Sequence, residues 1–132
     1  MVATTVTIIM PGAAIGKPRM TQKDKWAKRD CVMRYRAWAD HLRLLVHAAG
    51  GLPDTDRILD VSWVARFEPP KSTAKKRIAA MIGELHRVKP DRDNIDKAVL
   101  DVLFENDQGI ACGTIRKEWA EQSSLTITIT YE

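Results

Sequence analysis

The feature that most restricts the fold is the alternation in "LTITITY", residues 125–131, where apolar side chains take turns with threonine. Successive side chains of a β-strand point to opposite faces of a sheet, so this period of two predicts a strand over 124–131. Strand character recurs at residues 4–10, which end at Pro11-Gly12, and at residues 57–67 and 109–119. At 132 residues the chain is long enough for one domain and too short for two.

Helical periodicity fills the intervals between these strands. Apolar residues recur at helical spacing over residues 30–49, and Gly50-Gly51 ends that helix. Residues 71–85 predict a short helix with Ser72 or Thr73 as its cap. A third helix carries a buried stripe formed by Ile95, Ala98, Val99, Val102 and Leu103.

The element order β-α-β-α-α-β-β predicts a single α+β domain over residues 1–132, with α/β-type layers. A small sheet of about four strands packs against the helices, and the short link "AEQS", residues 120–123, predicts a hairpin of the last two strands. No apolar run approaches the length of a membrane span, so we expect no membrane partner. Two separate cysteines, Cys31 and Cys112, and no secretion signal predict reduced thiols and a cytoplasmic protein.

Positive charge gathers in one segment of the chain. The net charge is +4, yet eight basic residues face only two acidic ones between Lys17 and Arg36. Such an excess is typical of a phosphate-binding face, although a solvated loop and helix surface is the alternative. Trp26, Tyr35 and Trp38 can stack on bases or anchor the core. The candidate DNA-binding residues are Lys17, Arg19, Lys23, Lys25, Lys28 and Arg29.

Carboxylates gather in "HRVKPDRDNIDKAVLDVLFENDQ", residues 86–108. If the chain stays extended from Pro90 through Asp93, the side chains of Asp91 and Asp93 point to one side and can share a divalent cation. Asp107 follows the helix and can fold back to complete the site. Lys97, one turn after Asp93, can hold a phosphate or stabilise developing negative charge. Oxygen ligands favour Mg²⁺ or Mn²⁺ over zinc.

Helix capping is the competing interpretation of these acids. Asp93 is a good N-cap, and Asp96 sits at the reciprocal position of a capping box. Capping does not require Asp91, Asp101, Glu105 or Asp107, so a metal site and a capped helix both remain open. A calcium loop does not fit, because Ile95 and Asp96 stand where a ligand and a glycine belong.

The segment "KPDRDNIDKAVLDVLF" followed by "NDQ" resembles the signature of the RusA family of Holliday junction resolvases, which are crossover junction endodeoxyribonucleases. The opening "TIIMPGAAIGKPRMTQKDKW" and the later "PPKSTAKKR" resemble the family too, so the likeness covers nearly the whole chain. The resemblance implies a small mixed sheet with helices, a homodimer, and hydrolysis of branched DNA with Mg²⁺ or Mn²⁺. The catalytic positions of the family fall on Asp91, Asp93, Lys97 and a third acid, placed at Asp107.

This sequence departs from the family at the third acid. Asn106 stands where the first Asp of an acidic pair is common, and Glu105 competes with Asp107 for the role. The resemblance also implies that Asn94 orients its neighbours and that Lys17 and Arg19 contact phosphates.

Together the residues and the resemblance predict a Mg²⁺-dependent endonuclease that resolves four-way DNA junctions by paired, symmetric phosphodiester hydrolysis, with Asp91, Asp93 and Asp107 as metal ligands. A two-fold symmetric junction that needs two cuts suits a C₂ homodimer. We expect no organic cofactor. The alternatives are a nuclease for other branched or flap DNA, and a DNA-binding protein of the same fold that does not cleave.

Overall fold

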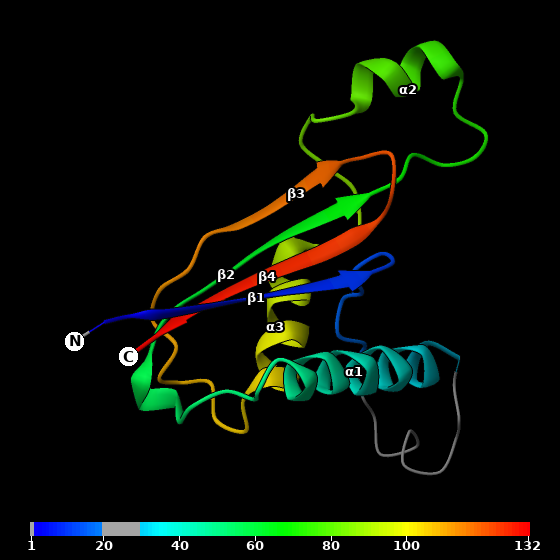
Figure 1. The fold of residues 1–132 in the computed structure, drawn as a ribbon. Helices are drawn as coiled ribbons and strands as arrows, with labels where there is room; N and C mark the ends of the chain where they lie inside the picture. Colours follow the sequence, from blue (N-terminus) through cyan, green and yellow to red (C-terminus); the bar gives the residue numbers. More distant parts are fainter. Residues whose placement is uncertain (1, 20–29) are drawn as a thin grey trace.

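A mixed four-stranded sheet with the strand order β1-β4-β2-β3 organises the fold (Figure 1). The structure is a computed structural model, and it describes residues 2–19 and 30–132. The elements follow the predicted order: β1 (Thr4–Pro11), α1 (Asp30–Ala48), the 3₁₀ turn η2 (Thr55–Arg57), β2 (Ile58–Phe67), α2 (Lys75–Met81), α3 (Arg92–Leu103), β3 (Ile115–Trp119) and β4 (Ser124–Tyr131). The predicted α+β class is confirmed.

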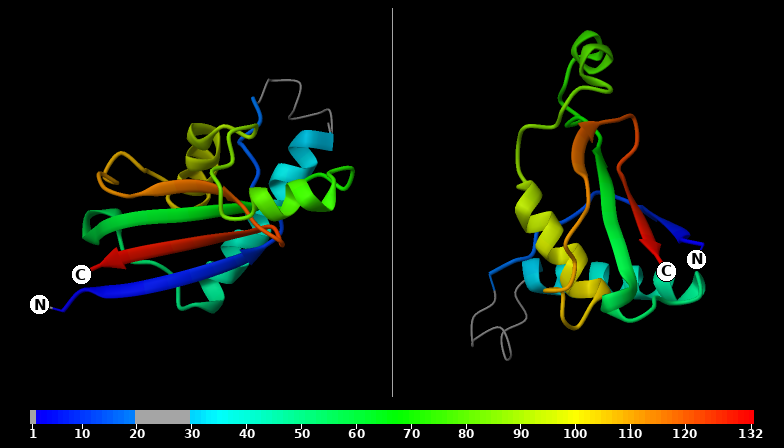
Figure 2. Two further views of the ribbon diagram at one scale, coloured as in Figure 1. Left: turned by 90° about the horizontal axis from the view of Figure 1, so that it is seen from above. Right: turned by 90° about the vertical axis from the view of Figure 1, so that its left-hand side faces the viewer.

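Two of the helices cover one face of the sheet and build the core with it. Figure 2 shows α1 and α3 on the same side of the strands, while α2 stands beyond their end. The alternation of β4 places Leu125, Ile127 and Ile129 in the core, each fully buried. Tyr35 and Trp38 of α1 are buried in this core as well. They therefore anchor the core and do not stack on bases. Trp26 lies outside the described residues.

The predicted C-terminal hairpin is wrong, because β2 lies between β3 and β4. β3 runs parallel to β2, and β4 pairs antiparallel with both β1 and β2. The short link after β3 crosses the end of β2: the Ala120 amide donates to the Phe67 carbonyl at 2.9 Å, and the Glu68 amide donates to Ser123 Oγ at 3.0 Å. A period of two identifies a strand but not its neighbours.

β3 is shorter than predicted, since it begins at Ile115 and not near Gly109. The preceding residues still follow β2, because the amides of Val61 and Trp63 donate to the carbonyls of Cys112 and Thr114, each at 3.0 Å. Gly113 permits this approach: a Cβ atom there would lie 1.9 Å from the Val61 carbonyl oxygen.

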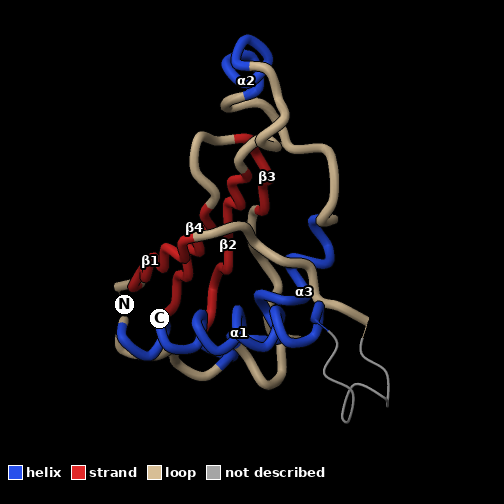
Figure 3. The backbone as a smooth tube through the Cα atoms, turned by 90° about the vertical axis from the view of Figure 1, so that its right-hand side faces the viewer, coloured by secondary structure: helices blue, strands red, loops and turns tan. Residues whose placement is uncertain are grey.

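Neither of the side chains expected to cap the short helix α2 does so. Its N-cap residue is Ala74, which has no side-chain hydrogen bond to offer, so the prediction of Ser72 or Thr73 as the cap is wrong. No residue of α2 is buried, and Figure 3 shows it standing away from the other helices. Among the described residues no helix is long and apolar enough to cross a membrane.

Candidate active site

The N-terminal end of α3 carries the two carboxylates of the D-x-D motif. Asp91 is the N-cap residue, with the extended φ of −68° and ψ of 144°, and its carbonyl accepts from the Ile95 amide at 3.1 Å. The predictions that Asp93 caps the helix and that the chain is extended through Asp93 are therefore wrong, because the helix already begins at Arg92. The Asp91 carboxylate makes no capping hydrogen bond. Capping thus does not account for its side chain.

Asp91 and Asp93 nevertheless line the same open cavity, which has a volume of about 870 Å³. The segment 86–89, Arg92 and Lys117 complete its wall. A smaller cavity of about 370 Å³ adjoins it, with Lys89 and Asp91 in both walls and Gly16, Lys17 and Asn94 among its other lining residues. Both carboxylates are exposed, and neither forms an ion pair within the part of the chain that the structure describes. The helix start therefore presents two carboxylates without an ion-pair partner in residues 2–19 and 30–132 to one open space, whose wall also carries the basic residues Arg87, Lys89, Arg92 and Lys117.

Lys117 of β3 fastens the turn in front of Asp91. Its Nζ donates to the carbonyl of Val88 at 2.7 Å and to the carbonyl of Pro90 at 2.6 Å. Burial lowers the pKa of Lys117, and the nearby charge of Asp91 partly opposes that effect. Lys117 was not among the residues predicted for the site. The signal that could have found it is the alternation in β3, which places Lys117 between Ile115 and Trp119 on one side of the strand.

His86 forms another part of the cavity wall that sequence analysis missed. It is 5% exposed and lies between Phe67, with ring centroids 4.1 Å apart, and Trp119, at 4.4 Å. Its Nδ1 has no hydrogen-bond partner in the described structure. Burial, and then the charge of Lys117, lower the pKa of the imidazole. The neutral ring therefore predominates at neutral pH.

The C-terminal half of α3 carries acids of a different kind. Lys17 Nζ forms a hydrogen-bonded ion pair with the Asp101 carboxylate, and the Lys17 amide donates to the Asn94 carbonyl at 3.2 Å. The hydrogen bond to Asp101 raises the pKa of Lys17 more than burial lowers it, and Asp107 adds a further attraction. The loop after β1 therefore lies along α3, and its lysine offsets the acids there.

Asp107 lies at this end of α3 and not in the cavity of Asp91 and Asp93. The Ile110 amide donates to the Asp107 carbonyl at 2.9 Å, and Thr55 Oγ1 donates to the Asn106 carbonyl at 3.4 Å, so the turn is tied to the η2 segment. The twelve residues of α3 span about 18 Å. In residues 2–19 and 30–132 no three Asp, Glu, His or Cys side chains gather into a metal-binding group. The structure thus does not bring Asp107 together with Asp91 and Asp93.

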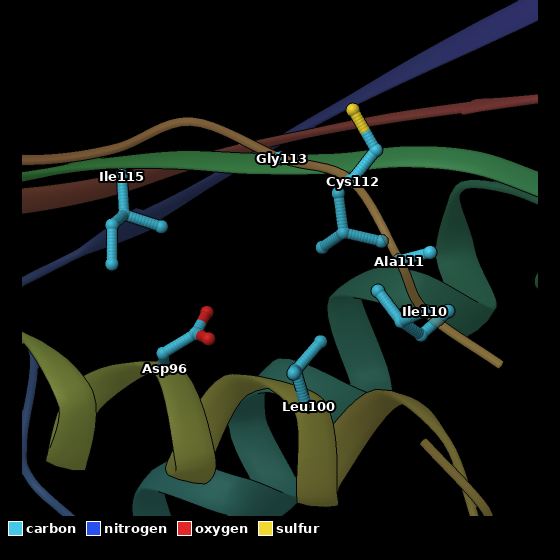
Figure 4. A pocket seen from close by; sticks show the side chains of 8 residues that line it. Asp96, Leu100, Ile110, Ala111, Cys112, Gly113 and Ile115 are labelled. Atoms are coloured by element: carbon cyan, nitrogen blue, oxygen red, sulfur yellow. The ribbon is translucent and has the colours of Figure 1, made fainter. Parts of the chain in front are cut away.

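The remaining acids and the lysine of α3 have separate environments. Lys97 and Glu105 are exposed. Asp96 Oδ1 accepts from the indole Nε1 of the buried Trp63 at 2.9 Å, which replaces its expected role in a capping box. Figure 4 shows the Asp96 carboxylate pointing into a pocket of about 210 Å³ between α3 and residues 110–115, with the sulfur of Cys112 turned away.

The candidate DNA-binding residues are only partly described. Lys17 is ion-paired as above, and Arg19 is exposed. Lys23, Lys25, Lys28 and Arg29 lie outside the described residues.

Comparison with known proteins gives one match over most of the chain. The family model described as "Endodeoxyribonuclease RusA" matches residues 11–130. That range contains every candidate residue of the site, the strands β2 and β3 and all of β4 except Tyr131, whereas of β1 it contains only Pro11. A search of curated proteins finds no match.

Proposed function

Since the chain belongs to the RusA family of endodeoxyribonucleases, we propose that it resolves four-way DNA junctions by paired, symmetric hydrolysis of phosphodiester bonds and that it needs Mg²⁺ or Mn²⁺ to do so. The observation that carries this proposal is the shared cavity of Asp91 and Asp93, whose carboxylates have no cationic side chain paired with them in the described chain. Two such groups repel each other and a DNA phosphate alike. A divalent cation between them relieves both repulsions.

The residues of the cavity fit a hard divalent ion. Mg²⁺ is commonly held by one or two carboxylates, with water and substrate phosphate filling its other positions, and an open cavity leaves room for them. Asp91 and Asp93 would hold the ion. When bound, it would lower the pKa of a water molecule and offset charge on the scissile phosphate.

The chain's own residues supply position and positive charge. Lys117 holds the turn that carries Asp91, through its two hydrogen bonds to Val88 and Pro90. Lys97 stands one turn after Asp93 on an exposed face, and we propose that it stabilises the negative charge developing on the phosphate.

In this proposal Asp107 does not bind the metal ion directly. Because it lies with Asp101 beside Lys17, its carboxylate would act on the electrostatics of the Lys17 loop, and it would join the pair of Asp91 and Asp93 only if the turn at residues 104–110 moves.

A homodimer completes the proposal. A four-way junction is two-fold symmetric and needs two cuts, so two copies related by a two-fold axis would offer one site to each strand. Action on DNA fits a cytoplasmic location.

The test compares cleavage of three labelled substrates, a four-way junction, a linear duplex and a flap, with Mg²⁺ and with a chelator. We expect symmetric nicks confined to the junction, only with the metal ion. Asp93→Asn should remove cleavage and keep junction binding, whereas the matched variant Asp96→Asn, which keeps an acceptor for Trp63, should cleave normally. Cleavage of the flap alone would indicate a different branched substrate. Binding without cleavage at any metal concentration would indicate a DNA-binding protein that does not cut.

A further inference from the structure

The segment 69–83, here called the α2 arm, projects from the end of the sheet. In Figures 1 and 3 it stands beyond the ends of β2 and β3, clear of α1 and α3. Its attachment lies at its base, where the Gly83 amide donates to the Trp119 carbonyl and the Trp119 amide donates to the Glu84 carbonyl, each at 2.9 Å. The core does not require this projection, because no residue of α2 is buried.

The α2 arm is strongly and uniformly basic. It contains four basic residues and no acidic one. All four side chains are exposed, and none of them forms an ion pair with another described residue. They are Lys71, Lys75, Lys76 and Arg77. A projecting segment that keeps four uncompensated cations in solvent has the charge pattern of a polyanion-binding element.

A groove connects the arm with the cavity of Asp91 and Asp93. The groove has a volume of about 470 Å³ and runs from Pro70 and Arg77 of the arm to Val88 and Trp119. Val88 also lines the cavity of the two carboxylates, and Trp119 packs on His86 in its wall. A strand that leaves the carboxylate cavity by this route therefore meets Val88 and Trp119 first, and then Arg77, the one basic residue of the arm that lines the groove.

We propose that the α2 arm is a second DNA-binding element, which takes backbone phosphates of the DNA strand next to the cut site. It is separate in sequence from the basic segment 17–36. Lysine and arginine suit phosphates, while the half-buried Trp119 and the exposed Val88 (56%) offer apolar contact to sugars. This inference rests on the proposed function, because it assumes that DNA enters the carboxylate cavity.

The experiment measures binding of a labelled four-way junction by fluorescence anisotropy as NaCl is raised, with Asp93→Asn as the parent protein to prevent cutting. A neutral arm carries Lys71→Gln, Lys75→Gln, Lys76→Gln and Arg77→Gln. A matched control keeps the charge with Lys71→Arg, Lys75→Arg, Lys76→Arg and Arg77→Lys. Circular dichroism melts check that both remain folded.

We expect the neutral arm to reduce the slope of log K against log [NaCl] by about 2 to 4, because each lost phosphate contact removes roughly 0.9. The control should bind like the parent. Equal slopes for the neutral arm and the parent would overturn the inference and leave the proposed function intact. A changed sedimentation coefficient in the neutral arm variant would overturn it too, since the arm would then contact a second copy. Failure of the parent to bind the junction would overturn both.

Discussion

The two ends of α3 carry carboxylates in opposite electrostatic settings. At the N-terminal end, Asp91 and Asp93 share an open cavity and have no ion-pair partner among the described residues. At the C-terminal end, Asp101 is paired with Lys17, and Asp107 attracts the same lysine. The sequence shows similar acids at both ends. The chain offsets the charge at the C-terminal end with an ion pair and leaves the two carboxylates of the N-terminal end exposed to solvent.

This difference also identifies which contacts hold each end in place. The N-terminal end depends on a strand residue, Lys117, which binds the carbonyls of the turn before Asp91. The C-terminal end depends on loop residues, through Thr55 to the Asn106 carbonyl and Lys17 to Asp101, while the Lys17 amide also binds the Asn94 carbonyl near the N-terminal end. A site that has to orient two carboxylates gains from attachment to a sheet, because side chains on a rigid element are held more accurately than side chains on loops.

Removing a carboxylate at the N-terminal end should have the largest effect. We expect Asp91→Asn and Asp93→Asn each to lower junction cleavage by about 10³-fold or more, since several kcal/mol of charge stabilisation are lost with the metal ion. The free energy of unfolding should change by less than about 0.5 kcal/mol, because both side chains are exposed. Single-turnover cleavage and urea unfolding measure the two effects. Asp101→Asn is the matched control, and an equal loss of cleavage in that variant would break the comparison between the two ends.

Lys117 should have the next largest effect on cleavage. Lys117→Met leaves the Val88 and Pro90 carbonyls without their donor, so the turn before Asp91 loosens, and we expect cleavage to fall by about 10- to 100-fold, as for residues that support metal ligands. Cleavage at a series of Mg²⁺ concentrations should show a weaker apparent metal affinity, while junction binding in chelator stays the same. Lys117→Arg should recover part of the rate. A loss of junction binding in chelator would instead mean that Lys117 contacts the DNA.

Asp96 lies between the two ends and should affect stability without affecting cleavage. Asp96→Ala leaves the Trp63 indole nitrogen buried without an acceptor, so the free energy of unfolding should fall by about 1–3 kcal/mol. Asp96→Asn keeps an oxygen in place and should cost much less. Thermal melts and junction cleavage of both variants check this. Reduced cleavage by a fully folded Asp96→Asn would move Asp96 into the reactive site.

The order of elements was predictable because it depends on local periodicity. The alternation over residues 125–131 and the stripe from Ile95 to Leu103 each correspond to an element close to its observed bounds. Strand neighbours were not predictable, because the polar link after β3 is equally compatible with a hairpin and with the observed crossing over Phe67.

The motif residues of the candidate site were predictable from the sequence, whereas the long-range contacts around them were not. The motif "PDRDN" pointed to Asp91 and Asp93 through its resemblance to a family, and the structure places both in one cavity. The contacts of Lys117 with Val88 and of Lys17 with Asp101 join residues far apart in the chain. They form only once the sheet is complete, so they could not be predicted from the sequence. Asp93 was expected at the N-cap, whereas it is the second residue of α3. Helix boundaries are uncertain by one or two residues when they are predicted from sequence.

The free energy of unfolding should depend on pH through His86, which lines the cavity at the N-terminal end of α3. Its pKa in the folded chain lies below the ordinary 6.5, so the unfolded chain binds the proton more readily. The free energy of unfolding should therefore be unaffected above pH 6.5 and should fall as the pH drops from 6.5 toward the folded pKa. His86→Phe, which keeps the stack with Phe67 and Trp119, should lose this part of the pH dependence. Urea unfolding across the acidic range measures it, and an identical curve for the variant would contradict the assignment.

The ion pair at the C-terminal end should have the smallest effect on stability. Lys17 and Asp101 are each 37% exposed in their side chains, so solvent screens the pair, and a double-mutant cycle of Lys17→Met and Asp101→Asn should give a coupling of about 1 kcal/mol or less.

Asp101→Asn releases Lys17 and removes a negative charge beside it, so we expect junction affinity in chelator to rise about two- to fivefold at low salt. Lys17→Met with Asp101→Asn should cancel the gain. If the gain survives in the double variant, the loss of the Asp101 charge alone explains it. If affinity falls in Asp101→Asn, the pair is needed to hold the Lys17 loop along α3, and the C-terminal end then serves DNA binding through shape and not through charge.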